Sequence, residues 1–526
     1  MDVCGRRFGF VFALSSCALV APVLEAQTRF SELRGHEVAQ VGWYAAAIAT
    51  VDVDRDGDLD LIVGNGGTIG FEEPGLYLND GTGRFTYARD KLPLLRSLVT
   101  CIGVGDLDGD GWPDVVLGSF GYGFGTVRNR MLRNDGAGGF VDVTESMFPP
   151  YHSTCGALQF SDATTDLVLA DVDGDGDLDI VFANWCQDRL YLNDGRGNFV
   201  DATFQRMVLE SDTTNCVVAA DFDGDGAIDL AFGNMHAVEG RSALNRLCLN
   251  DGNGFFRDAS DRLPQQADET MAMAAADVDG DGDVDLIVGN GGYTYGSRGQ
   301  QNRLWRNDGR GRFTDATAGN LPSLLDNTQA LVATDLDGDG DADLYVANGR
   351  FGTMESDRIL WNSGNGAFTG KTVGETPLFP SETMAIAPGD IDGDGDVDLV
   401  VGRVGGVSLW LNQRRHVFVD AVPRIGEFAK IQVALSEGRL AAPAVARLFL
   451  GLHRASLRIE PLGVLGIDPT TAVELQPVMV PAPMGIASTG FEIPNDPSLR
   501  GVAFHLQMLA LPHDLRLSNV WSDRVR

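Results

Sequence analysis

Short apolar runs recur along this chain, and each one follows a polar loop of nearly constant composition. Examples are LDLIVGN after the first loop and VDLVVGR after the seventh. Runs of this length and composition predict buried β-strands. Another apolar segment precedes each loop, and hairpins such as LYLNDGTGRFT follow it, in which Asn-Asp-Gly predicts a tight turn because these residues tolerate positive φ. Each repeat therefore predicts four strands.

The spacing of the polar loops predicts the architecture. They begin at Asp52, Asp106, Asp171, Asp221, Asp277, Asp335 and Asp390, and successive starts lie between 50 and 65 residues apart. This period is typical of four-stranded propeller blades and far from the short repeats of calcium β-helices. The sequence therefore predicts an all-β fold, a seven-bladed β-propeller.

The strand before each loop carries two kinds of side chain. The residue four positions before the loop is large and apolar, and should pack between blades: Ile48, Ile102, Leu167, Val217, Met273, Leu331 and Ile386. The residue five positions before is mostly small, as we expect where seven inner strands crowd around an axis: Ala47, Cys101, Asp166, Cys216, Ala272, Ala330 and Ala385.

Each polar loop reads D-x-D-x-D-G-x-x-D, with Asp at positions one, three, five and nine. This pattern suits Ca²⁺, which prefers hard oxygen ligands. It provides carboxylates on alternate residues, a Gly that permits a sharp turn, and a closing Asp. An EF-hand would need Glu at position twelve and a helix on each side. Position twelve is instead Val63, Leu117, Phe182, Phe232, Val288, Val346 and Val401, each inside an apolar run. The loops therefore predict calcium sites within β-hairpins, up to seven in all.

The predicted metal set comprises positions one, three, five, seven and nine of every loop. It is Asp52, Asp54, Asp56, Asp58 and Asp60; Asp106, Asp108, Asp110, Trp112 and Asp114; Asp171, Asp173, Asp175, Asp177 and Asp179; Asp221, Asp223, Asp225, Ala227 and Asp229; Asp277, Asp279, Asp281, Asp283 and Asp285; Asp335, Asp337, Asp339, Asp341 and Asp343; and Asp390, Asp392, Asp394, Asp396 and Asp398.

With these seven motifs, residues from about 27 to 423 resemble the FG-GAP or VCBS repeat proteins, whose calcium propellers include the integrin α-subunit head and certain fungal lectins. The resemblance implies a propeller with its calcium loops on one face and its partners commonly on the opposite face. It says much less about function, because one fold supports many functions.

The charge of the chain excludes one class of partner. Its formal net charge is −34, to which the Asp loops contribute much. Seven bound Ca²⁺ would still leave about −20, so nucleic acid is a poor partner.

The N-terminus predicts export. Arg6 and Arg7 precede an apolar stretch and then Ala26, which has the plan of a secretory signal peptide over residues 1–26. The segment LSSC also resembles a bacterial lipobox, which would place a lipid on Cys17. No second segment reaches the ~20 apolar residues that span a bilayer. We therefore expect a secreted or cell-surface protein without a transmembrane span.

Export to an oxidising compartment would allow cysteines to form disulfides. Cys155 and Cys186 flank the first two strands of the third repeat, so they form either a disulfide or two small apolar fillers.

Candidate ligand-binding side chains lie in the variable segments between the second and third strands. They are Tyr122, Trp185, His236, Tyr293, Tyr295 and Phe351. Aromatic rings on Gly-rich loops can stack on sugars, anchor a protein partner, or simply pack the loops. A polar ring at the expected channel mouth, including Asp166 and Asn215, could likewise hold a ligand. The predicted partner is an extracellular glycan or protein.

Signals of catalysis are nearly absent. The chain has no H-E-x-x-H, G-x-S-x-G or phosphate-binding motif. A non-enzymatic binding or adhesion protein is therefore the main interpretation. The alternative is a secreted carbohydrate-active enzyme, similar to polysaccharide lyases, or a lectin on the same scaffold.

The pattern changes after residue 423. Alternating apolar strands broken by Pro and Gly predict a small C-terminal β-sandwich over residues 424–526. One ambiguity remains in the propeller, because both RFSEL at residues 29–33 and VFVDAV at residues 417–422 resemble the fourth strand of a blade.

Overall fold

The computed structural model describes most of the repeat region. Residues 44–66, 73–95, 97–120, 128–150, 163–210, 212–235, 244–292, 299–349, 355–370 and 382–412 are described with their side chains. The strands Phe30–Glu32 and those from Val417 onward are described as backbone only. The predicted signal peptide and Cys17 lie outside the described residues.

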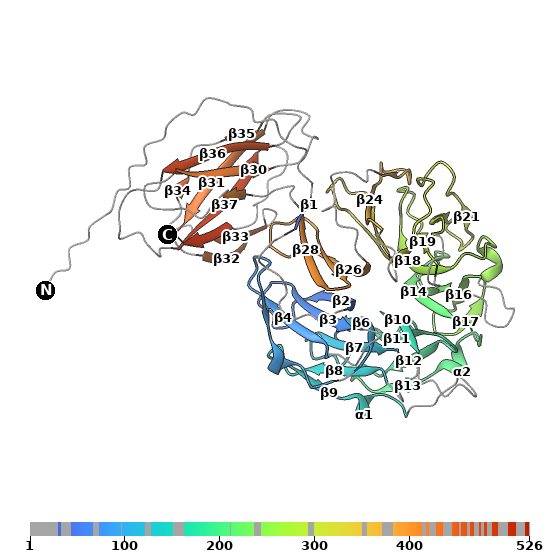
Figure 1. The fold of residues 1–526 in the computed structure, drawn as a ribbon. Helices are drawn as coiled ribbons and strands as arrows, with labels where there is room; N and C mark the ends of the chain where they lie inside the picture. The colour runs from blue at the N-terminus through green and yellow to red at the C-terminus, as the bar shows by residue number, and fades with distance from the viewer. Residues whose placement is uncertain are drawn as a thin grey trace. The chain divides into compact units, whose positions relative to one another are not determined.

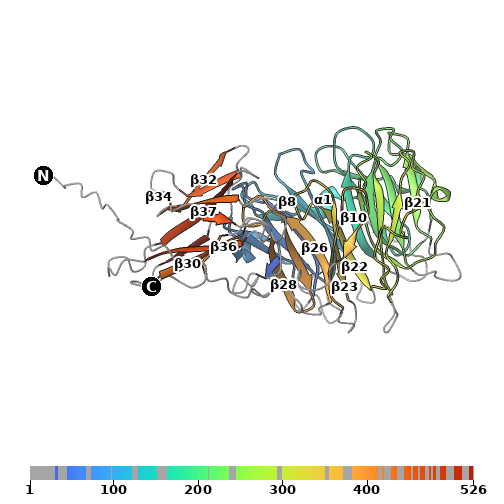
Figure 2. The ribbon, with the colours of Figure 1, turned by 90° about the horizontal axis from the view of Figure 1, so that it is seen from above.

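Seven four-stranded antiparallel sheets make up the larger of two compact units, which comprises Phe30–Ile391 and Val397–Leu411. They follow one another in chain order, from blue to orange (Figures 1 and 2). Blade one is β2 (Ala45–Val51), β3 (Asp60–Asn65), β4 (Gly75–Asn79) and β5 (Phe85–Tyr87); blade two is β6 (Val99–Gly105), β7 (Asp114–Ser119), β8 (Arg130–Asn134) and β9 (Phe140–Asp142); blade three is β10 (Thr164–Ala170), β11 (Asp179–Asn184), β12 (Arg189–Asn193) and β13 (Phe199–Asp201). Blade four is β14 (Thr214–Ala220), β15 (Asp229–Asn234), β16 (Arg246–Asn250) and β17 (Phe256–Asp258).

The remaining blades repeat the same order. Blade five is β18 (Thr270–Ala276), β19 (Asp285–Asn290), β20 (Arg303–Arg306) and β21 (Thr314–Asp315); blade six is β22 (Thr328–Thr334), β23 (Asp343–Asn348), β24 (Arg358–Trp361) and β25 (Thr369–Gly370). Blade seven is β26 (Thr383–Gly389), β27 (Asp398–Arg403), β28 (Gly406–Asn412) and β1 (Phe30–Glu32). Short helical turns follow the fourth strands of the first four blades: η1 (Arg89–Lys91), α1 (Thr144–Met147), α2 (Thr203–Arg206) and η4 (Ser260–Arg262). The predicted seven-bladed propeller is confirmed.

The ring closes with a strand from the beginning of the chain. The first strand of each blade contacts the first strands of both neighbours, and β26 contacts β2. The outer strand of blade seven is β1, which pairs with β28, whereas Val417–Val419 (β29) pairs with β30 (Phe428–Ala434). Of the two segments that resembled a fourth strand, the N-terminal one therefore completes the propeller.

The hydrophobic core is divided among the interfaces between blades. Seven buried clusters each combine residues of two neighbouring blades. Leu167, for example, packs with Leu107 and Val116 of the preceding blade. The residues four positions before the loops all belong to such clusters, which confirms that they pack between blades. Position twelve of each loop lies in a buried second strand, as predicted.

Our explanation for the small residues five positions before the loops is wrong. Cys101 and Cys216 are buried in the interface with the following blade, and not around the axis. They are small because the two sheets approach closely there: a methyl group on Gly118, opposite Cys101, would lie 3.0 Å from Thr164 Cγ2 of the next blade. Alternate side chains of an inner strand thus face the two neighbouring blades.

The hairpin between the third and fourth strands is longer than the tight turn that we predicted. In blade three, Asn193 ends β12 and Phe199 begins β13, so five residues connect them. Gly195 and Gly197 adopt positive φ of 71° and 75°. The Asn of the Asn-Asp-Gly step therefore belongs to the strand, and its side chain is available for other contacts.

The other compact unit contains the strands that follow Asn412. They are β29 and β30, then β31 (Ala444–Gly451), β32 (Arg454–Ile459), β33 (Gly463–Ile467), β34 (Val473–Glu474), β35 (Val478–Val480), β36 (Ile486–Glu492), β37 (Ala503–Leu511) and β38 (Trp521–Arg524). The longest antiparallel pairings join β30 to β36 and β31 to β37. In the described part of the chain, no helix is long and apolar enough to cross a membrane.

Gly118 is crowded by Cys101 of its own sheet and by Thr164 of the next blade, which makes a testable prediction. A Cβ there would lie 2.1 Å from Cys101 Sγ, so Gly118→Ala should lower the free energy of unfolding by about 1–3 kcal/mol through overpacking. The double variant Cys101→Ala/Gly118→Ala should regain part of this loss, because the sulfur is gone. Chemical unfolding measures both. A Gly118→Ala variant as stable as the parent would contradict the interpretation.

Candidate metal sites

The first Asp of each loop shapes the turn. In the third loop, the backbone N–H groups of Gly174 and Gly176 donate to the two oxygens of Asp171 at 2.8 and 3.0 Å. Gly176 has φ of 95°, as its predicted role in a sharp turn requires. The same pair of bonds recurs in the loops that begin at Asp106, Asp221, Asp277 and Asp335. The first carboxylate is therefore fixed by the backbone that it organises.

The first loop departs from this pattern at position four. Arg55 stands where the other loops have Gly, and it takes the positive φ of 59° that Gly normally provides. Here Asp52 accepts from the N–H groups of Asp56 and Gly57, at 3.2 and 3.0 Å. The loop keeps its anchored first carboxylate.

The ninth residue joins the loop to the rest of its blade. Asp179 accepts from the N–H of Val172 at 3.1 Å and from the N–H of Asn193 at 2.8 Å. It is fully buried. Equivalent pairs of bonds hold Asp60, Asp114, Asp229, Asp285 and Asp343. The ninth carboxylate is thus held between the start of the loop and the end of the third strand.

The third residue carries the most informative atom of the site. Asp173 directs Oδ2 to the guanidinium of Arg206 at 3.2 Å, but its Oδ1 is buried and has no hydrogen-bond partner in the described structure. The Oδ1 atoms of Asp54, Asp223 and Asp279 are equally buried and unpartnered there. A buried, unpaired carboxylate oxygen is strongly unfavourable unless a cation satisfies it.

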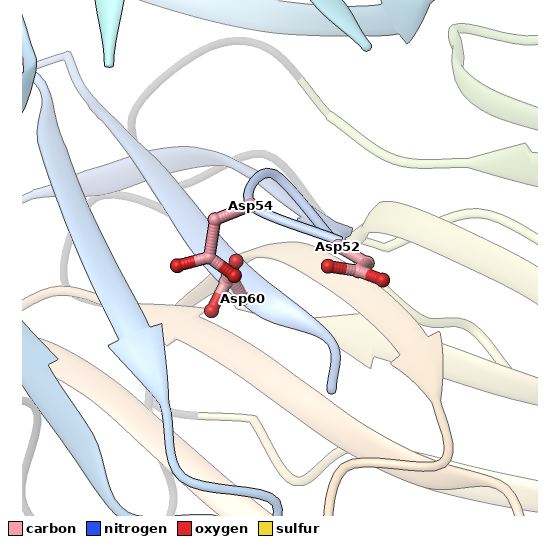
Figure 3. A group of neighbouring side chains, drawn as sticks. All are labelled: Asp52, Asp54 and Asp60. Atoms are coloured by element: carbon pink, nitrogen blue, oxygen red, sulfur yellow. The ribbon is translucent and has the colours of Figure 1, made fainter. Parts of the chain in front are cut away.

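These carboxylates converge on one point. The oxygens of Asp52, Asp54 and Asp60 lie within 4.8 Å of one another, and Figure 3 shows the three side chains drawn together from the loop and the second strand. Similar groups form at Asp106, Asp108 and Asp114; at Asp171, Asp173 and Asp179; at Asp221, Asp223 and Asp225; and at Asp277, Asp279 and Asp285, with two more in the described residues. All donors are oxygens, as a hard divalent cation such as calcium requires.

The pKa values of several of these Asp side chains are raised. Burial raises the pKa of Asp60 and Asp179 to about 7, although each accepts two backbone N–H bonds that act in the opposite direction. Burial, and then the charge of Asp175, also raises the pKa of Asp173. A bound cation would remove both causes, because it solvates the carboxylate and screens its neighbours. The residues present therefore fit a metal ion.

Positions five and seven have different roles. Asp175 is exposed and accepts from the N–H of Asp177 at 3.0 Å, and the corresponding bond recurs in the other six loops. The carboxylate of Asp177 instead lies against the hairpin, since a Cβ on Gly195 would be 2.4 Å from it. Trp112 and Ala227 occupy position seven in two loops. Only backbone atoms are common to position seven, so its side chains do not form part of a repeated donor set.

One functional residue was not predicted from the sequence, the Asn that ends or directly follows a third strand. The side-chain N–H₂ of Asn193 donates to Leu178 O in its own loop at 3.1 Å and to Leu107 O in the loop of the preceding blade at 2.9 Å. Its Oδ1 accepts from Gly197 N at 3.2 Å. Every Asn-Asp-Gly hairpin contained this Asn, but the turn it predicted gave no indication of a bond across blades.

Of the predicted ligand-face residues, Trp185 is described and the other five lie outside the described residues. Its ring meets Phe120 of the preceding blade edge-on, with centroids 4.7 Å apart. Both side chains are partly exposed, just after the second strands and away from the Asp loops. The adjacent Cys186 is disulfide-bonded, while Cys155 lies outside the described residues. The structure thus contains one aromatic pair at the end expected to meet a partner.

Two side chains of the polar ring, Asp166 and Asn215, form hydrogen bonds between blades. Asp166 accepts from the N–H of Val217 in the next blade at 3.0 Å, and burial raises its pKa to about 6. Asn215 donates to Thr270 O, again across a blade interface, at 3.0 Å. These bonds give both residues a structural role.

Comparison with known proteins supports the repeat structure. The family model described as FG-GAP-like repeat matches residues 52–117, 106–169, 171–232, 235–288, 293–346 and 335–401. Among solved structures, a lectin from Agrocybe aegerita, described as specifically recognising non-reducing terminal N-acetylglucosamine, is 19% identical with a TM-score of 0.41. The match covers 69% of this chain and 87% of the lectin. No curated protein matches the chain.

Proposed function

The chain belongs to the FG-GAP-like repeat family, and on that premise we propose that it is a calcium-stabilised propeller with one Ca²⁺ in each Asp loop. The observation that carries this proposal is the buried, unpartnered Oδ1 at position three of four loops. Asp at positions one, three, five and nine would hold the ion, with the backbone carbonyl of position seven. Calcium would supply the positive charge that these clustered carboxylates lack.

The expected contribution to stability is large. Extracellular calcium modules bind at ~0.1–1 mM, so at ~1 mM free Ca²⁺ each site adds up to roughly 1.4 kcal/mol by mass action. Seven sites would add roughly 10 kcal/mol, which is comparable to the whole stability of a domain. The propeller is therefore folded securely only where calcium is plentiful.

We further propose that the protein acts outside the cytoplasm as a non-enzymatic binding or adhesion protein. The predicted signal peptide over residues 1–26 supports export, and so does the disulfide at Cys186, because disulfides persist in oxidising compartments. Its ligand is an extracellular glycan or protein that meets the end of the propeller bearing Trp185. Partly exposed aromatic rings are suited to stacking on sugars or anchoring protein side chains.

The rest of the chain forms a separate module in this proposal. Residues 27–423 would contain the propeller, and residues 424–526 a small β-sandwich that assists attachment or partner binding. The long antiparallel pairings of β30 with β36 and of β31 with β37 support two sheets. A sandwich buries the apolar face of each sheet against the other.

Calcium removal tests the proposal. Native mass spectrometry of the protein in millimolar calcium should count seven ions, and excess EDTA should lower the melting temperature steeply because seven stabilising ions are lost. An unchanged melt in EDTA, together with far fewer than seven ions, would refute a structural role for calcium.

Two variants in separate loops provide the control. Asp225→Ala removes a ligand from the fourth loop, so it should reduce the ion count and the melting temperature. Asp177→Asn changes a carboxylate that lies against Gly195, so it should retain every ion. If Asp225→Ala binds as many ions as Asp177→Asn and melts at the same temperature, the assigned ligand set is wrong.

The binding role requires its own experiment. The calcium-loaded protein should bind members of a glycan or matrix-protein array, and Trp185→Ala should abolish this binding without changing the melting temperature. Trp112→Ala, at the calcium-loop end, is the matched control and should bind normally. Release of new reducing ends or unsaturated sugars would favour the carbohydrate-active enzyme instead. Binding that survives Trp185→Ala would contradict the assigned face.

A further inference from the structure

In six blades, the Asn that ends or directly follows the third strand touches two Asp loops, as Asn193 of blade three illustrates. Asn193 donates its backbone N–H to Asp179, the closing ligand of the third loop, at 2.8 Å. Its amide donates to Leu107 O, in the second loop, at 2.9 Å. Asn193 is buried, with 8% of its surface exposed. One side chain therefore joins the proposed calcium sites of two blades.

The backbone carbonyl that accepts from Asn193 belongs to the second Asp loop. Leu107 stands between the ligands Asp106 and Asp108, and its N–H donates to the closing ligand Asp114 at 3.2 Å. Its side chain is 1% exposed, in the core between blades two and three. The carbonyl held by Asn193 belongs to the Leu107–Asp108 peptide. Asn193 therefore restricts how Asp108 is presented to an ion.

Equivalent hydrogen bonds join other pairs of neighbouring blades. Asn79 reaches Ile391 O at 2.8 Å and so joins blade one to blade seven. The others donate to the corresponding carbonyl of the preceding blade at 2.7–3.0 Å: Asn134 to Val53, Asn250 to Val172, Asn307 to Phe222 and Asn362 to Val278. A connection repeated in six of the seven blades is a property of the fold.

Backbone packing supports this connection independently. A Cβ on Gly109, in the second loop, would lie 3.2 Å from Gly195 O in the hairpin of blade three. Gly174 and Gly224 stand in the same relation to Gly252 O and Gly309 O. The second, third and fourth loops thus pack closely against the hairpin of the next blade.

We propose that the calcium sites are energetically coupled through these asparagines, so that an ion in one loop raises the affinity of the loop in the preceding blade. This inference rests on the proposed calcium function. An ion bound to Asp179 fixes the end of β12, and with it Asn193, which then holds Leu107 O in the second loop. Because coupling free energies are reciprocal, an ion in the second loop favours the third equally.

The second loop contains its own reporter for the test. Trp112 occupies position seven of that loop, so Tb³⁺ bound there should be sensitised by its indole. Calcium competition against this luminescence measures the affinity of the second loop in the full-length protein. Trp112→Phe should abolish the signal and thereby assign it.

Two variants in blade three should weaken calcium binding in blade two. Asp175→Ala removes a ligand of the third loop, and Asn193→Asp replaces the donating amide with an acceptor that faces two carbonyls. Each should lower the affinity of the second loop about five-fold or more, within the usual range of coupling. The matched control is Asn198→Asp, which adds a negative charge to the same hairpin at a side chain whose hydrogen bonds to described residues go to Asp194. It should leave that affinity unchanged.

The outcomes separate the two proposals. A parent protein that binds neither calcium nor Tb³⁺ overturns the proposed function. A parent that binds both, but whose second-loop affinity is the same in Asp175→Ala and Asn198→Asp, overturns only the coupling. Asp175 is an exposed side chain, so Asp175→Ala keeps the test decisive even if Asn193→Asp fails to fold.

Discussion

Repulsion among clustered carboxylates is the constraint on which the rest of this propeller depends. In the first five loops, three Asp side chains bring carboxylate oxygens within 4.8 Å of one another, and several Asp oxygens are buried without a partner in the described structure. Like charges so close destabilise the ionised state unless a cation lies between them. Hydrogen bonds around the loops account for this crowding. Backbone N–H groups fix the carboxylates at loop positions one and nine, and the carboxylate at position three is directed toward them. Hydrogen bonds within the protein therefore organise the loop.

The same loops also hold the blades in a ring. The residue at position two fills the core between blades, its N–H binds the closing carboxylate, and its carbonyl accepts from the next blade's Asn. Leu107 combines all three contacts. The geometry of the proposed metal site, the packing of the core and the contact between blades two and three therefore meet at Leu107. These contacts all lie at the Asp-loop end of the propeller. The sequence at the opposite end, where Trp185 and Phe120 meet, can therefore vary without loss of the fold.

Local patterns predicted most of this structure because they act over a few residues. The apolar run around Phe182 forms a buried strand, and Leu167 packs between blades, as alternation required. Contacts between segments that are distant in the sequence were harder to predict. The pairing of β1 with β28 joins the two ends of the repeat region, and no local pattern favoured it over residues 417–422. Asn193 predicted a turn, whereas its amide bond to Leu107 depends on a neighbouring blade. The proposed ligand-binding residues lie in segments that do not repeat, so periodicity could not assign them.

A crystal structure of the protein grown in millimolar calcium, with anomalous scattering to locate the ions, tests the central claim most directly. The account predicts a calcium ion in each Asp loop, with carboxylate oxygens at positions one, three, five and nine about 2.3–2.6 Å from it. The Oδ1 of Asp173, unpartnered among the described residues, should be one of these ligands. Empty loops at saturating calcium, or ions bound only by exposed carboxylates outside the loops, would contradict it.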